Sequence, residues 1–162
     1  MKTLDSMIRT NSVLRGTIFM LCWLVWPATA HAQMTISGGN ILMNITSAQA
    51  GSEPTAVTNT ICTLTYRRQA SVSKVTVSTS CPGQKFTLRV VAVNPTEGVA
   101  APQVTLVNGM LAAALINNIP ALPPATNRTC TLSYTASATF AQGNSVELGD
   151  DVHTVTYTIV AQ

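Results

Sequence analysis

The chain has 162 residues, of which 9% are charged and 46% are hydrophobic, and its formal net charge is +3. Three of its basic residues, Lys2, Arg9 and Arg15, lie close to the N-terminus, so the remainder of the chain is nearly neutral. The other Lys and Arg residues are scattered, whereas nucleic-acid binding requires clustered positive charge. The composition therefore excludes a nucleic-acid-binding protein.

Residues 1–32 have the pattern of a secretory signal peptide. A basic start is followed by the apolar run 18–26 and by a small-x-small cleavage site, Ala30-His31-Ala32. That run is about half as long as a bilayer-spanning helix, and no later apolar stretch reaches that length, so we expect no membrane span. Cleavage before Gln33 would leave residues 33–162 as a single β-sandwich domain. We expect this mature protein to be secreted, periplasmic or attached to the cell surface.

Most of the elements predicted after the leader are strands, because apolar and polar residues alternate in them. In chain order they cover residues 40–46, 61–67, 74–80, 85–93, 103–107, 129–140 and 152–160. Gly38-Gly39, before the first strand, predicts a bulge or bend. Residues 110–118 are rich in helix formers and end before Pro120, so they are predicted as a helix of one or two turns.

The strand predicted at 129–140 contains a motif that also occurs earlier in the chain. Residues 58–66 and 126–134 share the pattern Thr-Asn-x-x-Cys-Thr-Leu-(Thr/Ser)-Tyr. This echo predicts that the two strands occupy matching places in two halves of one fold.

The number of strands indicates the fold class. Turn signals recur about every ten to fifteen residues and helix is almost absent, which is typical of an all-β protein. We expect an immunoglobulin-like antiparallel β-sandwich of about seven or eight strands with one short helix. A small Greek-key barrel is the alternative.

Three cysteines follow the leader, and an exported compartment permits a disulfide. If residues 61–67 and 74–80 form a hairpin, Cys62 lies opposite Cys81, and directly opposed strand residues have the Cα separation that a bridge requires. We therefore predict a Cys62–Cys81 disulfide, with Cys130 as a buried and unreactive thiol. The alternatives are a Cys62–Cys130 bridge between the sheets, and no bridge.

Few residues suggest catalysis or metal binding. His153 is the only histidine after the leader, and Asp151 lies two residues before it, on the same face of a strand. Two ligands are fewer than the three or four of a zinc site, and no Gly-x-Ser-x-Gly motif or phosphate loop accompanies them. We interpret the pair as part of a polar turn, and we expect no enzyme, no cofactor and no metal site.

Two further features are expected to belong to the surface. Arg67-Arg68, at the tip of the predicted hairpin, is interpreted as a solvated pair. Asn44-Ile45-Thr46 and Asn127-Arg128-Thr129 match the N-glycosylation triplet, which matters only in a eukaryotic secretory route.

The last predicted strand carries a resemblance to a known family. Gly149 is the fourteenth residue from the end, and Val155, Tyr157 and Ile159 alternate with threonines. Together with the leader, the few charges and the many threonines, this tail resembles chaperone–usher pilins and the related spore-coat-U-like secreted subunits. The resemblance implies an incomplete immunoglobulin-like sandwich that assembles when a strand from a neighbouring chain completes it.

These features predict a secreted structural or adhesive subunit of an extracellular or cell-surface assembly. Its partners would be other protein chains, including copies of itself, joined by β-strand addition. The candidates for strand exchange are the alternating apolar residues of the first and last predicted strands: Ile41, Met43, Ile45, Val155, Tyr157 and Ile159. The alternative is a self-contained secreted monomeric binding module for a glycan or a protein.

Overall fold

The computed structural model describes residues 34–121, 126–143 and 145–162, so the predicted leader lies outside the described residues. The strands are β1 Thr35–Ser37, β2 Val57–Arg67, β3 Ser73–Ser80, β4 Thr87–Val93, β5 Val99–Ala100, β6 Val104–Leu106, β7 Ala113–Ile119, β8 Asn127–Ser137 and β9 Thr154–Ala161. A 3-10 turn, Phe140–Gln142, and a short helix, α1 Ser145–Leu148, lie before β9. Within this described part, no helix has the length and apolarity to cross a membrane.

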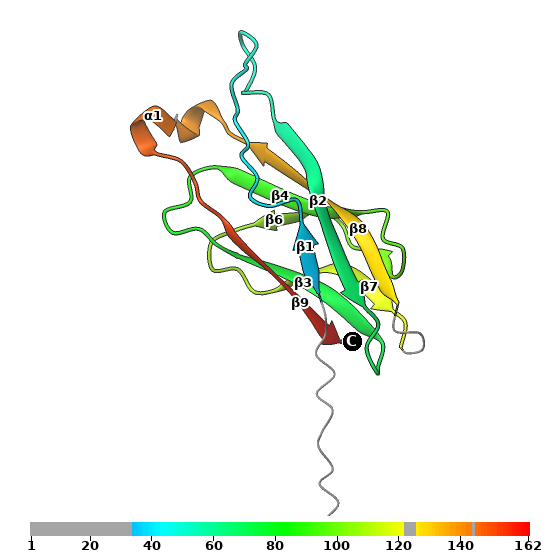
Figure 1. The fold of residues 1–162 in the computed structure, drawn as a ribbon. Helices are drawn as coiled ribbons and strands as arrows, with labels where there is room; N and C mark the ends of the chain where they lie inside the picture. Colours follow the sequence, from blue (N-terminus) through cyan, green and yellow to red (C-terminus); the bar gives the residue numbers. More distant parts are fainter. Residues whose placement is uncertain (1–33, 122–125, 144) are drawn as a thin grey trace, which may run out of the picture.

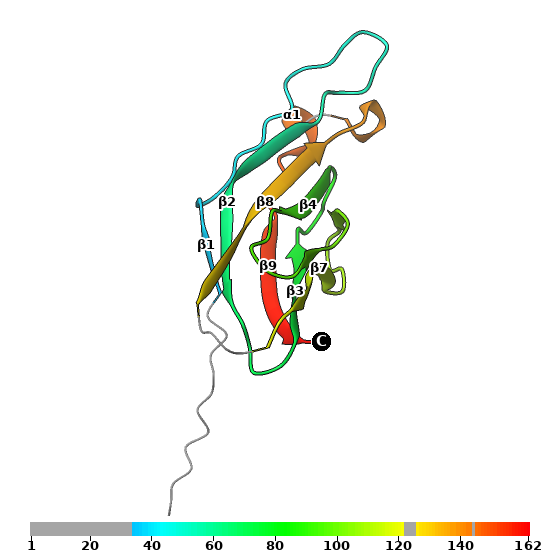
Figure 2. The same ribbon diagram turned by 90° about the vertical axis from the view of Figure 1, so that its right-hand side faces the viewer.

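The strands form two antiparallel sheets that face each other (Figure 1). One sheet has five strands in the order β1-β2-β8-β4-β6, and the other has four in the order β5-β7-β3-β9. Figure 2 shows the layers from the side, with β2 and β8 in one and β9 and β3 in the other. The predicted all-β antiparallel sandwich is confirmed, with nine strands in the described residues where about seven or eight were expected.

Part of the strand order matches an immunoglobulin sandwich, although β6 extends one sheet beyond β4, and β7 and β5 extend the other beyond β3. In that fold, strands A, B, E and D form one sheet, and strands C, F and G form the other. Here β1, β2, β8 and β4 follow the A-B-E-D order, and β3 lies beside β9 as C lies beside F. No strand among the described residues occupies the place of G on the other side of β9.

Alternating residues of the central strands fill the space between the sheets. Leu64 on β2, Leu132 on β8 and Val77 on β3 are fully buried, and burial of such a side chain contributes about 1.5–3 kcal/mol. Tyr134 of β8 and Tyr157 of β9 meet inside this core, with their hydroxyl oxygens 2.5 Å apart. The two sheets are therefore joined by a buried hydrogen bond as well as by apolar packing.

The two copies of the repeated motif lie side by side in the five-stranded sheet. β2 and β8 pair with Thr63 opposite Thr131, Cys62 opposite Leu132 and Leu64 opposite Cys130. Each Cys-Thr-Leu triplet thus faces its own copy around a local twofold axis at the threonine pair. The two copies are therefore symmetry-related, hydrogen-bonded neighbours at the centre of one sheet.

Residues 110–118 do not form the predicted helix. Most of them belong to β7, which pairs with β3 on one side and β5 on the other. Leu115, Ile116 and Ile119 are fully buried there. The helix preference of Ala and Leu is worth only tenths of a kcal/mol per residue, so pairing and burial override it.

The strand predicted at residues 40–46 is also wrong. The first strand is β1, and Gly38 and Gly39 then turn the chain away from β2 with φ angles of 111° and 69°. A Cβ on Gly38 would lie 2.8 Å from the carbonyl oxygen of Ile61, so only glycine permits this close approach. The predicted bend is confirmed, and residues 40–46 continue beyond it as a segment that belongs to neither sheet.

Candidate functional site

The C-terminal strand β9 has one free edge. On its other edge it pairs with β3 along its whole length, from Thr154 opposite Ser80 to Ala161 opposite Ser73. No described strand pairs with the free edge, which is the position of strand G in an immunoglobulin sandwich. Backbone N–H and C=O groups of β9 are therefore available there for another strand.

A groove of about 1210 Å³ runs beside this free edge. Its lining includes buried residues of both sheets, Cys62, Tyr134 and Tyr157. Its rim includes Leu42 and Val152, whose exposed fractions are 80% and 76%. The groove thus opens from the apolar core to a rim of exposed apolar side chains.

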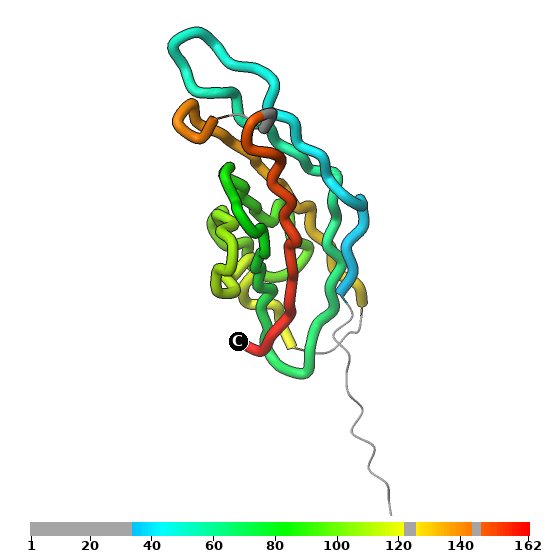
Figure 3. Tube along the Cα trace, turned by 90° about the vertical axis from the view of Figure 1, so that its left-hand side faces the viewer, coloured from blue at the N-terminus to red at the C-terminus, as the bar shows by residue number. Residues whose placement is uncertain are grey.

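Residues 40–46 lie along this groove in an extended conformation. Ile41, Met43 and Ile45 are half-buried and line it, whereas the residues between them are exposed. Figure 3 shows this segment, which follows β1, on the same side of the sandwich as β9. Its side chains alternate as in a strand, although the segment makes no strand ladder with β9 or β2.

The structure brings together most of the residues predicted for strand exchange. Ile41, Met43, Ile45, Val155 and Tyr157 line the same groove, and Ile159 packs against the core that β9 helps to form. Sequence analysis identified the two alternating segments but gave no reason to place them beside each other. It also missed the groove residues on other strands, such as Leu88 and Ala136, because their position depends on how the sheets pack.

The predicted disulfide is not formed. Cys62, Cys81 and Cys130 are free thiols, and β2 and β3 lie in different sheets, so the hairpin register on which the Cys62–Cys81 bridge rested is wrong. The alternative bridge between the sheets fails as well, because Cys62 and Cys130 lie on neighbouring strands of one sheet, two positions out of register. Such diagonal residues are about 7–8 Å apart, beyond the usual Cα range of a disulfide.

Cys130 has the environment predicted for it. Its exposed fraction is 2%, and burial raises the pKa of its thiol to about 11. The thiolate is the reactive form of cysteine, so this side chain acts as a small core residue at neutral pH.

A second feature lies where the chain leads into β9. The ligand-type atoms of Cys81, Asp151 and His153 all lie within 4.8 Å of one another. Cys81 follows β3 and is 1% exposed, whereas Asp151 and His153 are half-buried and line the groove. Sequence analysis noted the acid and the histidine but missed Cys81, because 70 residues separate it from Asp151 and no local spacing signals their contact.

The side chains of this cluster are held by neighbouring segments. The two carboxylate oxygens of Asp151 accept hydrogen bonds from the backbone N–H of Lys85, and Oδ2 also accepts one from Phe86 at 2.7 Å. Nδ1 of His153 lies 3.2 Å from Oγ1 of Thr79. Burial lowers the pKa of His153, although the charge of Asp151 opposes this shift, so the imidazole is neutral at neutral pH.

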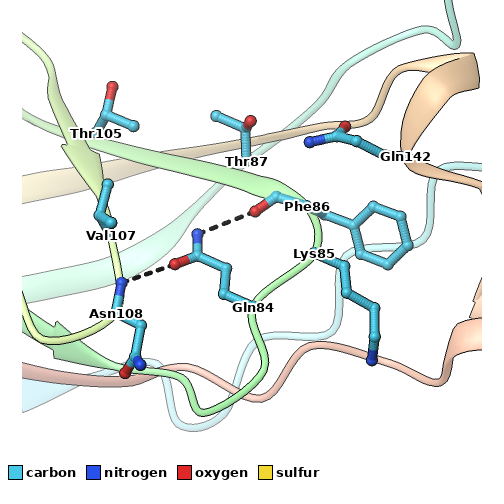
Figure 4. Close-up of a pocket in the computed structure, with 8 residues that line it drawn as sticks. All are labelled: Gln84, Lys85, Phe86, Thr87, Thr105, Val107, Asn108 and Gln142. Atoms are coloured by element: carbon cyan, nitrogen blue, oxygen red, sulfur yellow. Dashed lines mark hydrogen bonds between the residues drawn. The ribbon is translucent and has the colours of Figure 1, made fainter.

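Gln84 fixes the loop that presents these N–H groups. Its side-chain amide donates to the carbonyl oxygens of Phe86 and Leu106 and accepts from the backbone N–H of Asn108. Figure 4 shows the amide between Phe86 and Asn108 in a depression of about 400 Å³. Because its polar atoms are already bonded within the protein, we interpret this depression as structural.

Arg68 is not the solvated residue that was predicted. It forms an ion pair with Glu97, in which its Nε donates to Oε2 at 2.6 Å. Arg128 contributes a second cation, with Nε 2.8 Å from the same oxygen. Arg67 donates to the side-chain oxygen of Asn127 at 2.6 Å. These contacts connect the end of β2 to the start of β8 and to the β4–β5 loop.

Comparisons of the chain with protein-family models, with curated proteins and with solved structures found no match.

Proposed function

We propose that the protein is a secreted structural or adhesive subunit whose sheet is extended by a β-strand from another chain. The observation that carries the proposal is the free edge of β9, eight residues long, beside an apolar groove. An added strand gains affinity from main-chain hydrogen bonds and register from alternating side chains. The proposed role is non-catalytic.

The composition of β9 supports the proposal. Edge strands are usually protected against pairing by charged residues, by proline or by short length. The sequence Thr-Val-Thr-Tyr-Thr-Ile-Val-Ala has no charge and no proline. The sequence of β9 therefore carries neither the charges nor the proline that commonly prevent strand addition.

We further propose that the added strand is residues 40–46 of a second copy of this chain. In the same chain, Ile41, Met43 and Ile45 already lie against the groove, so their spacing and size suit it. The same residues from a neighbour could occupy the groove and also pair with β9. Each hydrogen bond gained would contribute about 0.5–1.5 kcal/mol.

Replacement of single residues in this segment tests the proposal. Ile41→Asp should abolish oligomers in size-exclusion chromatography with light scattering, because a charge would enter an apolar groove at a cost of several kcal/mol. Leu111→Asp is the matched control: Leu111 is 91% exposed and lies outside the groove, so this variant should assemble like the wild type. Deletion of residues 34–46 should also abolish assembly, and a peptide of that sequence should bind the shortened protein.

One observation favours a different function. Residues 40–46 already cover part of the groove within the same chain, as expected of a complete monomeric module that binds a glycan or a protein. A monodisperse wild-type monomer at high concentration, together with unfolding on deletion of residues 34–46, would support this second function and contradict strand addition. Equal assembly of Ile41→Asp and Leu111→Asp would exclude residues 40–46 as the added strand.

A further inference from the structure

We propose that Cys81, Asp151 and His153 bind a zinc ion at the end of the groove where β9 begins. Their ligand-type atoms come from two segments far apart in sequence and all lie within 4.8 Å of one another. Zinc-ligand bonds of about 2.0–2.3 Å place the ligands of a tetrahedral ion about 3.3–3.6 Å apart. The three side chains therefore need to close by little more than an ångström.

The types of ligand select the metal. A thiolate is a soft ligand that Mg²⁺ and Ca²⁺ do not favour, whereas a carboxylate is a poor ligand for Cu(I). Zinc accepts Cys, His and Asp together. One thiolate, one carboxylate and one neutral imidazole also balance the two positive charges of Zn²⁺, so the partly buried site would be neutral when occupied.

Contacts around the cluster orient two of the three ligands. The backbone N–H groups of Lys85 and Phe86 hold the carboxylate of Asp151, and the hydroxyl of Thr79 contacts the ring of His153. Ligands of metal sites characteristically have such outer partners, which fix their orientation. Three protein ligands leave the fourth zinc position for water or for a group from another molecule.

Cysteine, histidine and aspartate could also form a nucleophilic triad, but Cys81 does not suit that role. Its exposed fraction is 1%, and it is not among the residues that line the groove, so a substrate in the groove would not reach its sulfur. Coordination to an ion that enters beside Asp151 and His153 requires no such exposure of the sulfur.

Titration with zinc and cobalt tests the site. The protein is purified without a histidine tag, reduced and treated with a chelator before Zn²⁺ is added in a calorimeter. We expect one equivalent to bind and to raise the melting temperature. Co²⁺, used as a spectroscopic substitute, should give a near-ultraviolet thiolate-to-metal absorption band.

Variants identify the ligands. Cys81→Ser should remove the near-ultraviolet band, and His153→Gln and Asp151→Asn should each weaken zinc binding at least tenfold. Cys62→Ala is the matched control, because Cys62 is a buried cysteine outside the cluster, and it should keep the band and the affinity. The half-buried His153 allows a test even if Cys81→Ser does not fold.

Several results would overturn the proposal. These are a wild-type protein that binds no zinc, a cobalt complex without the thiolate band, and a band that persists in Cys81→Ser or disappears in Cys62→Ala. The proposal would also be overturned if His153→Gln and Asp151→Asn bound zinc as tightly as the wild type. None of these measurements depends on strand addition, so the two proposals succeed or fail separately.

Discussion

Tyr134 and Tyr157 place two hydroxyl groups in the core of the sandwich, where each is the other's hydrogen-bond partner. Tyr157→Phe leaves the hydroxyl of Tyr134 buried without this partner, which should lower the free energy of unfolding by about 1–3 kcal/mol. Replacement of both residues by Phe removes donor and acceptor together. We expect the double variant to be more stable than Tyr157→Phe, as measured by denaturant unfolding.

The variant with Phe at both positions separates loss of the hydrogen bond from other effects of removing each hydroxyl group. If its destabilisation equals the sum of the two single changes, the hydroxyl pair contributes no coupling, and the interpretation of a buried hydrogen bond between the sheets is contradicted.

Glu97 connects three segments through its ion pairs, and these make stability depend on pH. Hydrogen bonds from Arg68, and then from Arg128, lower the pKa of Glu97 to about 2, whereas an unfolded glutamate titrates near pH 4.3. A group whose pKa falls on folding stabilises the protein above its unfolded pKa, and this stabilisation is lost as the pH falls toward 2. Glu97→Gln should therefore be less stable than the wild type at pH 7, and the difference should shrink between about pH 4.3 and pH 2.

Thermal unfolding across this pH range measures the effect. Asp150→Asn replaces an exposed carboxylate that lies outside the ion-pair network, and it should not reproduce the pH-dependent difference. A constant difference between Glu97→Gln and the wild type from pH 7 to pH 2 would show that the ion pairs do not stabilise the fold.

At the scale of elements, the bend after β1 determines where the N-terminal segment lies. β1 pairs with β2 through Ile36 opposite Leu64, and Gly38 then approaches the backbone of β2 more closely than any side chain allows. Continued pairing would have kept the chain on the edge of β2. The bend instead directs residues 40–46 along the groove beside β9.

Substitution of this glycine tests that role. In Gly38→Ala, the new Cβ would lie 2.8 Å from the Ile61 carbonyl oxygen, so the backbone must shift and residues 40–46 should leave the groove. We expect faster protease cleavage within residues 40–46 and a loss of more than about 1 kcal/mol in stability, because positive φ alone costs alanine about that much.

Gly39→Ala separates the effect of the positive φ angle from the effect of the close contact with β2. Gly39 also has positive φ but no atom near the position of a Cβ, so its variant should lose stability without exposing the segment. Equal cleavage rates in the two variants would mean that the contact with β2 does not hold residues 40–46 in place.

Most of the strands with alternating apolar and polar residues were predicted well, although the alternating segment 40–46 is not a strand. β2, β3, β8 and β9 were expected near their observed positions because period-two burial leaves a clear pattern. β7 was mistaken for a helix because its Ala-rich sequence shows no such alternation, and it became a strand through pairing on both edges. Local preference determines structure only where tertiary contacts do not oppose it.

At the scale of the whole molecule, six of the strands (β1, β2, β8, β4, β3 and β9) keep the immunoglobulin order, and no strand follows β9 in the described residues. The described residues provide partners for one edge of that strand only, so a core that both sheets share remains open along one side. The free edge and the groove are consequences of this arrangement rather than of any single residue. The Cys81, Asp151 and His153 cluster lies at the end of the same side, since Asp151 and His153 precede β9 and line the groove.

The sequence by itself determined the all-β class, the burial of alternating residues such as Leu64 and Leu132, and the inward side of β9, because hydrophobic period and turn residues are local properties. Only the tertiary structure decided which strands are neighbours. It placed β2 and β3 in different sheets, which removed the predicted disulfide, and it brought Cys81 to Asp151 and His153. Pairing between distant segments depends on the burial of the whole core at once, and no local pattern records it.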